Sequence, residues 1–411
     1  MYIIAIIVNH EFDDNAKTWG IFTLVVSNIR LFSIIARLGF GNSIVRFSRE
    51  IINTKNKFNN KRLNLNELYW FAFILVFIVC LAQYFFFYLF FDEITFLILS
   101  TIENKNIIIY ILVGIFPFSL IFLNSGILKG HYKFREFSFF QMFLVNALML
   151  LILVLFSFFK YSIDIILIAY VLCVFIVSFY SFIFLLKKEF VKLSVSFNFK
   201  KYYESLKVSL NLFLSEGVNT LLPLVDILII QFFANEIFVG QYNIVHRIST
   251  LLSLFILAVN HVSMPKLANY INTKKINNVM YEIKKSILLS IMFSAPLFML
   301  ILIFPEFIFS LFKINNANLL TLLYILLMVQ FINIITGPSG IVLEMIGHEN
   351  KNRNIVLFAT AVKFFILFNC IDKYSILYAI ALSNFIYFII IKFFPLYFIY
   401  RLKLENNYQN D

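Results

Sequence analysis

The chain has 411 residues, of which 61% are hydrophobic and only 14% are charged. Soluble globular domains contain about 25% charged residues, so this composition excludes a water-soluble protein and predicts one embedded in a membrane. A formal net charge of +12 would suit a nucleic-acid partner, but the distribution of the basic residues argues against one.

Basic residues are sorted between alternate connectors of the apolar segments. One set of connectors holds 24 of the 34 Lys and Arg residues. These connectors are 46–67, 129–136, 187–207, 266–285, 351–353 and 401–403. The other set holds only Lys17, Lys105, Lys160, Lys313 and Lys373. Cytoplasmic loops of membrane proteins are rich in Lys and Arg, and anionic headgroups attract them there. The pattern predicts a multi-pass protein with a cytoplasmic C-terminus and no nucleic-acid partner.

The N-terminal stretch Tyr2–Val8 is apolar, but it is too short to span a bilayer. It has neither the basic leader nor the cleavage site of a signal peptide. Because the loop charges place the connector 9–19 outside the cytoplasm, we interpret this stretch as the end of a truncated first helix. The complete design would then have twelve helices with both termini in the cytoplasm.

Eleven further segments have about the 20 apolar residues that a spanning helix requires. They are 20–38, 68–91, 107–128, 138–159, 162–186, 207–233, 238–262, 286–312, 317–337, 354–370 and 374–400. Continuous apolar runs of this length predict helices, whereas the strands of a membrane barrel alternate over about ten residues. The predicted fold class is an all-α polytopic membrane protein with about eleven full spanning helices.

Short sequence matches indicate an internal repeat. Gly20 is followed 26 positions later by the basic residue Arg46, and Gly240 is followed 26 positions later by Lys266. The segment 128–131 also matches the segment 345–348. The offsets are 220 and 217 residues, and parallel repeats are a known plan of transporters. The predicted organisation is an N-terminal helix bundle at 1–186, a basic cytoplasmic linker at 187–206 and a C-terminal helix bundle at 207–411.

Charged side chains inside the apolar segments need a reason, because each costs roughly 2.5–3.5 kcal/mol at the centre of a spanning helix. Arg30 and Arg37 are seven residues apart and share a helix face. They could line a cavity for an anionic headgroup, or they could pair with another helix or extend to the interface. Arg247 and Lys363 are further candidates for substrate binding, while Lys392 is predicted to be structural or interfacial.

Polar residues in the segment 207–233 also follow one helix face. Glu216, Asn219, Pro223 and Asp226 have spacings of three, four and three residues. Glu216 or Asp226 could carry a coupling proton or sodium ion, since a buried carboxyl group can bind a proton near neutral pH. Alternatively, either carboxylate could pair with one of the arginines.

Motifs of enzyme chemistry are missing from the sequence. It has no P-loop, no Gly-x-Ser-x-Gly, no His-Glu-x-x-His and no dinucleotide fingerprint. The five histidines are scattered, and the three cysteines lie within apolar segments without metal-ligand spacing. We predict neither an enzyme nor a cofactor or metal site. Any transport would use an ion gradient or the gradient of the substrate itself.

Several ordered segments resemble the polysaccharide-exporter (Wzx-type) flippases of the multidrug/oligosaccharidyl-lipid/polysaccharide superfamily, which includes the MATE transporters. The segments are 20–22 (Gly-Ile-Phe), 37–47 (Arg-Leu-Gly-Phe-Gly-Asn-Ser-Ile-Val-Arg-Phe), 239–242 (Val-Gly-Gln-Tyr) followed by Arg247, 262–267 (Val-Ser-Met-Pro-Lys-Leu), 337–338 (Gly-Pro) and 343–351 (Leu-Glu-Met-Ile-Gly-His-Glu-Asn-Lys). Arg37 departs from the family, because many relatives have an acidic or neutral residue before the Gly-x-Gly turn.

This resemblance implies two six-helix bundles around a central cavity that opens alternately to the two sides of the membrane. It implies a bacterial inner-membrane protein whose substrate is an undecaprenyl-pyrophosphate-linked oligosaccharide repeat unit. A polysaccharide polymerase and a chain-length regulator are the protein partners that it suggests.

Two other functions remain open from the sequence. A drug or cation antiporter of the same superfamily would share the twelve-helix design but would be expected to have more carboxylates than arginines in its lumen. An O-antigen polymerase would carry a large outer loop, whereas the longest outer connector here is the short stretch 92–106.

Overall fold

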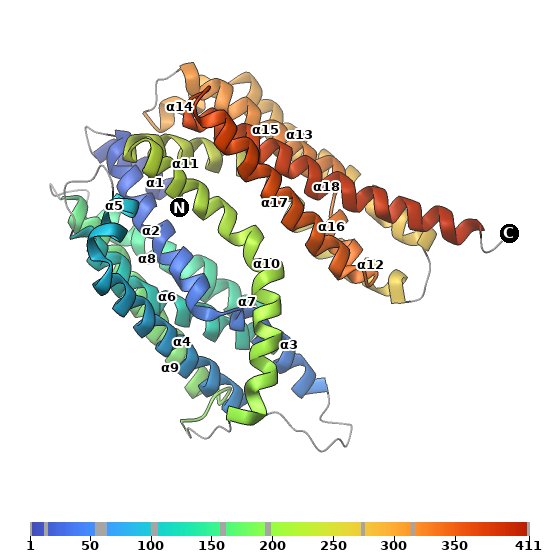
Figure 1. The fold of residues 1–411 in the computed structure, drawn as a ribbon, viewed down its shortest axis with the longest axis horizontal. Coiled ribbons are helices and arrows are strands. Elements are labelled where there is room, and N and C mark those ends of the chain that lie inside the picture. The colour runs from blue at the N-terminus through green and yellow to red at the C-terminus, as the bar shows by residue number, and fades with distance from the viewer. Residues whose placement is uncertain are drawn as a thin grey trace. The chain divides into compact units, whose positions relative to one another are not determined.

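The computed structural model describes residues 2–11, 15–53, 64–99, 106–156, 162–193, 199–272, 276–313 and 317–408. Every regular element within these ranges is a helix (Figure 1). The predicted all-α fold class is therefore confirmed.

The chain divides into two compact units, Met1–Gly240 and Gln241–Asp411. The first unit contains α1 (Tyr2–Glu11), α2 (Asn15–Arg37), α3 (Phe40–Asn53), α4 (Leu65–Leu89), α5 (Phe91–Leu99), α6 (Ile107–Gly130), α7 (Phe134–Ser138), the π-helical turn η2 (Phe139–Phe143), α8 (Leu144–Phe156), α9 (Ile163–Lys187), α10 (Phe199–Phe233) and the start of α11 (Glu236–Thr250). The second contains the rest of α11, α12 (Ser253–Asn272), α13 (Ile276–Ile303), α14 (Pro305–Leu311), α15 (Ala317–Thr336), α16 (Ser339–Met345), α17 (Glu349–Ile371) and α18 (Ile376–Tyr408).

Nine spans within the described residues are long and apolar enough to cross a membrane. They are 16–37, 65–89, 107–130, 134–156, 163–187, 278–303, 318–345, 350–371 and 376–401. The pair α11 and α12, bent at 251–252, makes a tenth if it counts as one span. The remaining predicted segment, 207–233, lies in α10, where the apolar helical stretch Thr220–Phe233 is shorter.

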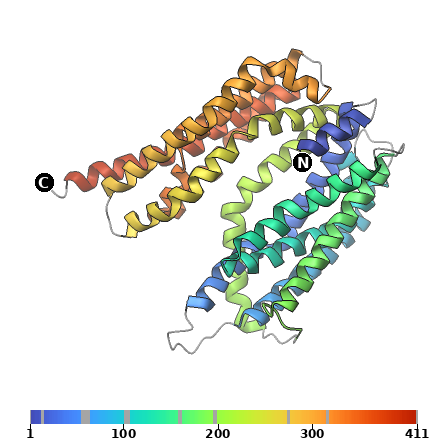
Figure 2. The ribbon, with the colours of Figure 1, turned by 180° about the vertical axis from the view of Figure 1, so that it is seen from behind.

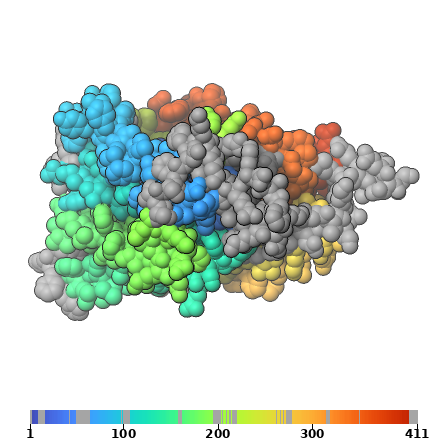
Figure 3. Space-filling view, turned by 90° about the horizontal axis from the view of Figure 1, so that it is seen from below, coloured from blue at the N-terminus to red at the C-terminus, as the bar shows by residue number. Residues whose placement is uncertain are grey.

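Helices α2 and α6 form the centre of the first unit. In the most apolar stretch of α2, 78% of the residues are buried, and in that of α6, 61% are. The corresponding share is 22% for α4 and for the span 134–156. The outer helices turn large apolar side chains such as Phe85 and Leu151 outward, as expected of a surface that faces lipid chains. In the space-filling view, the blue, teal and green segments of this unit pack closely together (Figure 3). Arg30 and Arg37 therefore lie on a helix at the centre of the unit.

The packing boundary lies after Gly240, which is later than the predicted linker at 187–206. The difference arises because α10 packs against α2 and α3 (Figure 2). Ser209 Oγ donates a hydrogen bond to Ser43 Oγ at 2.6 Å, and a Cβ atom at Gly39 would overlap the Ser209 carbonyl. By packing, α10 belongs to the first unit, while the division of the sequence into two repeats stays a prediction.

The two glycines that the repeat pairs with each other are in direct contact. A Cβ atom at Gly20 would overlap the carbonyl of Glu236, and one at Gly240 would overlap the carbonyl of Ala16. Beside this crossing, Lys17 Nζ lies 3.8 Å from Glu236 Oε1. Glycine at both positions is what allows the backbones of α2 and α11 to approach so closely.

A buried chain of polar side chains joins α4, α6 and α9. Tyr69 Oη donates to Asn124 Oδ1 at 2.7 Å, and Asn124 Nδ2 donates to Ser181 Oγ at 2.8 Å. Ser181 Oγ in turn donates to the Ser178 carbonyl at 2.8 Å. These bonds fix the rotation of three helices about one another in a low-dielectric interior.

Replacing Asn124 with Leu should destabilise the protein by about 1–2 kcal/mol, because it leaves the buried Tyr69 hydroxyl without a hydrogen-bond acceptor. Adding Tyr69→Phe should recover part of the loss, since the orphaned hydroxyl is then removed. Thermal unfolding in detergent of the single and double variants measures this coupling. A double variant less stable than Asn124→Leu alone would contradict the assignment.

Candidate functional site

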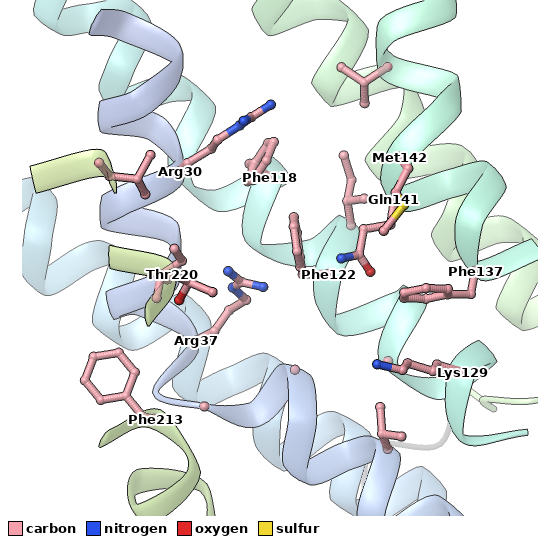
Figure 4. Close-up of a pocket in the computed structure, with 18 of the residues that line it drawn as sticks. Arg30, Arg37, Phe118, Phe122, Lys129, Phe137, Gln141, Met142, Phe213 and Thr220 are labelled. Atoms are coloured by element: carbon pink, nitrogen blue, oxygen red, sulfur yellow. The ribbon is translucent and has the colours of Figure 1, made fainter. Parts of the chain in front are cut away.

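A cavity of about 590 Å³ lies inside the first unit. Residues of α2, α3, α6, α8 and α10 line it, together with the α7–η2 segment and one residue of α9. Arg30 and Arg37 project into it from α2, and Lys129 projects from α6 (Figure 4). The two arginines predicted to share a helix face thus line one cavity.

Arg37 is held by its own helix and by an aromatic ring. Its Nε donates to the Ser33 carbonyl at 3.0 Å, and its guanidinium carbon lies 4.0 Å from the centre of the Phe122 ring. The helix ends directly after it, because Leu38 and Gly39 adopt positive φ angles of 47° and 82°. Only 9% of Arg37 is exposed, so the turn fixes a buried cation at the end of α2.

The other two cations also lie near phenylalanine rings. The guanidinium carbon of Arg30 lies 5.9 Å from the centre of the Phe118 ring, and Lys129 Nζ lies 5.3 Å from that of Phe137. Arg30 Nε is buried without a hydrogen-bond partner among the described residues. Contacts between a cation and an aromatic face contribute about 0.5–2 kcal/mol, and they leave the positive charge intact.

The arrangement follows from helix periodicity. On α6, Phe118, Phe122, Gly126 and Lys129 are spaced by four, four and three residues and therefore follow one face. This face is turned toward the arginines of α2, and the two helices are neighbours in the unit. The two helices bring aromatic and cationic side chains to one wall of the cavity.

No aspartate or glutamate occurs among the described residues that line the cavity. Three positive charges therefore share a low-dielectric space, and the described lining residues supply no opposite charge. Electrostatic attraction is strong where water is partly excluded, and a cleft lined by one sign of charge concentrates ligands of the other sign. The cavity is suited to an anion, and phosphate groups match arginine particularly well.

The remaining predicted residues lie elsewhere. Arg247 is in the second unit, where its Nε donates to Asn243 Oδ1 at 2.6 Å. Lys363, also in the second unit, is fully buried with its Nζ 6.0 Å from the centre of the Tyr387 ring. Asp226 is buried on α10 and is not part of the cavity lining. The side chain of Glu216 falls outside the described residues.

Sequence reasoning missed Lys129 and its aromatic neighbours. Lys129 counts among the basic residues of a connector, although it is the penultimate residue of α6. The spacing of Phe118, Phe122 and Lys129 could have revealed a shared face, but apolar spacing of this kind is common in any spanning helix. Within the described residues, no group of three His, Cys, Asp or Glu side chains is placed to hold a metal ion.

Comparison with known proteins decides the family. The sequence model of the polysaccharide biosynthesis protein family matches residues 15–271, more than half of the chain. The chain belongs to this family. No curated protein sequence matches it.

Solved structures share its fold. The MATE multidrug transporter DinF-BH has a TM-score of 0.67 and 13% identity, and MATE in complex with MaL6 has 0.64 and 17%. A MOP superfamily transporter from Pyrococcus furiosus, described by a reverse polarity of its binding pocket, has 0.64 and 16%. Each similarity covers 98% of this chain and 92% of the other. The long apolar helices and the fold identify a multi-pass membrane protein.

Inorganic pyrophosphate should raise the Tm of the purified protein, because its charge complements the cavity. At a concentration of 100 times Kd, binding would contribute about 2.7 kcal/mol. Thermal unfolding in detergent at constant ionic strength measures the effect, with tetraphenylphosphonium as a cationic probe that should not stabilise.

The double variant Arg30→Ala, Arg37→Ala should lose most of the pyrophosphate effect. Lys284→Ala is the control, since it removes a positive charge from an exposed position of α13. Stabilisation by tetraphenylphosphonium and not by pyrophosphate would refute an anion-binding cavity.

Proposed function

We propose that the protein moves undecaprenyl-pyrophosphate-linked oligosaccharide repeat units from the cytoplasmic to the periplasmic leaflet of the bacterial inner membrane. The cavity of the first unit carries the proposal, because its three cations lie close to aromatic rings and no described lining residue is acidic. A pyrophosphate group presents the compact negative charge that such a cavity attracts. Membership of the polysaccharide biosynthesis family supports a saccharide as the rest of the substrate.

The position of the cavity along its helices fits loading from the cytoplasm. Arg37 and Lys129 lie at the ends of α2 and α6, and the connectors near these ends are rich in basic residues. The positive-inside rule assigns such connectors to the cytoplasmic side, together with the C-terminus. The headgroup would enter at Lys129 and Arg37 and reach Arg30 deeper in α2.

The second unit would contribute its own cations. We assign substrate-binding roles to Arg247 and Lys363, whose charges lie within helices of that unit, and the polyprenyl tail would remain among membrane lipids. Glu216 or Asp226 would bind the ion that resets the alternating cycle. A polysaccharide polymerase and a chain-length regulator would take over the exported repeat units, and the mechanism requires no cofactor.

An ion-coupled drug or cation antiporter is the second candidate, because the fold is shared with MATE transporters. The cavity charge favours an anionic substrate over a cationic drug. The Pyrococcus furiosus transporter offers a parallel, since its description links a reverse polarity of the binding pocket to a different function. Charge in the cavity therefore separates the two candidates better than the fold does.

Genetic complementation tests the proposal. Expressed in a strain that lacks its own flippase but makes the matching glycan, the protein should restore surface polysaccharide. Replacing Arg30 and Arg37 together with Ala should lower it by at least about tenfold, because charged hydrogen bonds contribute about 1.5–3 kcal/mol each. Arg247→Ala is expected to act in the same direction.

Lys284→Ala serves again as the matched control and should export normally. Membrane levels of each variant are measured by immunoblotting. Normal amounts of surface polysaccharide from the double arginine variant would show that the cavity arginines are not needed for export. Export of a cationic dye, without any rescue of polysaccharide, would favour the antiporter.

The coupling role can be tested at Asp226, which is 2% exposed. If Asp226 carries the coupling ion, Asp226→Asn should slow repeated transport while leaving the binding of pyrophosphate unchanged. Transport into liposomes with and without an imposed proton or sodium gradient measures the difference. A variant that still responds fully to the gradient would exclude Asp226 and leave Glu216 as the candidate.

A further inference from the structure

The π-helical turn η2 contributes part of the cavity wall. It spans Phe139–Phe143 between α7 and α8, and the Leu144 N–H donates to the Phe139 carbonyl, five residues earlier. Such turns are rare, and they occur frequently at functional sites. The wider turn brings residues five positions apart closer to one helix face. It allows both Gln141 and Asn146 to line the cavity.

The two amides differ in their hydrogen bonding. Asn146 Nδ2 donates to the Met142 carbonyl at 2.7 Å, which holds this amide in place. Gln141 is only partly exposed, and its side chain makes no hydrogen bond with the described residues. Figure 4 shows its amide near Phe122 and on the side of Phe137 and Lys129. A neutral group with donor and acceptor atoms therefore faces the space beside the cations.

We propose that Gln141 recognises the first sugar attached to the pyrophosphate and so helps to select the substrate. This inference rests on the proposed flippase function. Arg30, Arg37 and Lys129 complement the phosphate charge, whereas an uncharged amide is poorly suited to add to it. Its carbonyl and NH₂ groups match sugar hydroxyl or N-acetyl groups instead. Because Gln141 lines the same cavity as the three cations, it is placed to contact the sugar nearest the phosphates.

The polar wall formed by Gln141 and Asn146 would select a substrate by the hydrogen bonds it offers. A site built to hydrogen-bond a substrate group discriminates against substrates that lack that group, because its own polar atoms are then left unpaired. Asn146 Oδ1 provides a second acceptor on the same wall. Gln141 thereby separates recognition of the sugar from recognition of the charge.

Two probes with the same charge and lipid distinguish these contributions. Farnesyl pyrophosphate carries no sugar, and N-acetylglucosaminyl-pyrophosphoryl-farnesol carries one directly on the pyrophosphate. Binding of each to the full-length protein in nanodiscs is measured by calorimetry. The variants are Gln141→Met, which keeps the side-chain length but removes the amide, and Gln141→Ala.

Phe143→Ala is the control on the same turn, since Phe143 is 60% exposed and does not line the cavity. Loss of the Gln141 amide should weaken binding of the sugar-bearing probe by about tenfold. It should change binding of farnesyl pyrophosphate by less than about twofold. Phe143→Ala should change neither.

Different results would contradict the role of Gln141 and the flippase function. Equal weakening of both probes by Gln141→Met would show a structural role and overturn the inference. Unchanged binding of both probes would overturn it as well, while the flippase proposal would stand. If the unmodified protein binds neither probe, the flippase proposal fails, and the assignment of Gln141 fails with it.

Discussion

The arrangement of helices in the first unit depends on how the buried positive charge of Arg37 is stabilised. Arg37 is nearly inaccessible to solvent, yet no described carboxylate lines its cavity. Its charge is stabilised by the Phe122 ring and by the Ser33 carbonyl. This solution requires α2 and α6 to lie side by side at the centre of the unit. It also requires the chain to turn immediately after Arg37, which positive φ angles at Leu38 and Gly39 permit.

Glycine at position 39 connects two requirements of the fold. Its φ angle of 82° is unfavourable for residues with a Cβ atom, and the Ser209 carbonyl occupies the space where that atom would lie. The same residue therefore ends α2 and admits α10. Because α10 also lines the cavity, the turn that positions Arg37 also admits one of the helices that line the cavity.

Much of the fold could be predicted from apolar segments, because segment length and loop charge are properties of the chain itself. Arg30 and Arg37 could be found for a similar reason, since charge inside a spanning helix is rare and needs an explanation. The ring contacts of Phe118 and Phe122 were not predictable, because they depend on the rotation of α6 about its axis. Nor could the sequence reveal the π-helical turn at Gln141, which alters the register of residues without a distinctive composition. The packing of α10 is likewise a tertiary effect that a repeat cannot specify.

The described cations of the cavity contact aromatic rings and not carboxylates. This difference affects how an anion would bind and be released. A carboxylate next to Arg30 or Arg37 would neutralise the cation, and an incoming phosphate would have to displace it. A ring contributes about 0.5–2 kcal/mol and can remain in contact while the guanidinium hydrogen-bonds a ligand. Among the described lining residues, anion binding then requires no ion pair to break, and none of these residues competes with the anion when it is released. Release must instead come from a change in solvent access, because water weakens the attraction many-fold. A cavity with this chemistry is therefore best suited to a protein that opens its site alternately to different compartments.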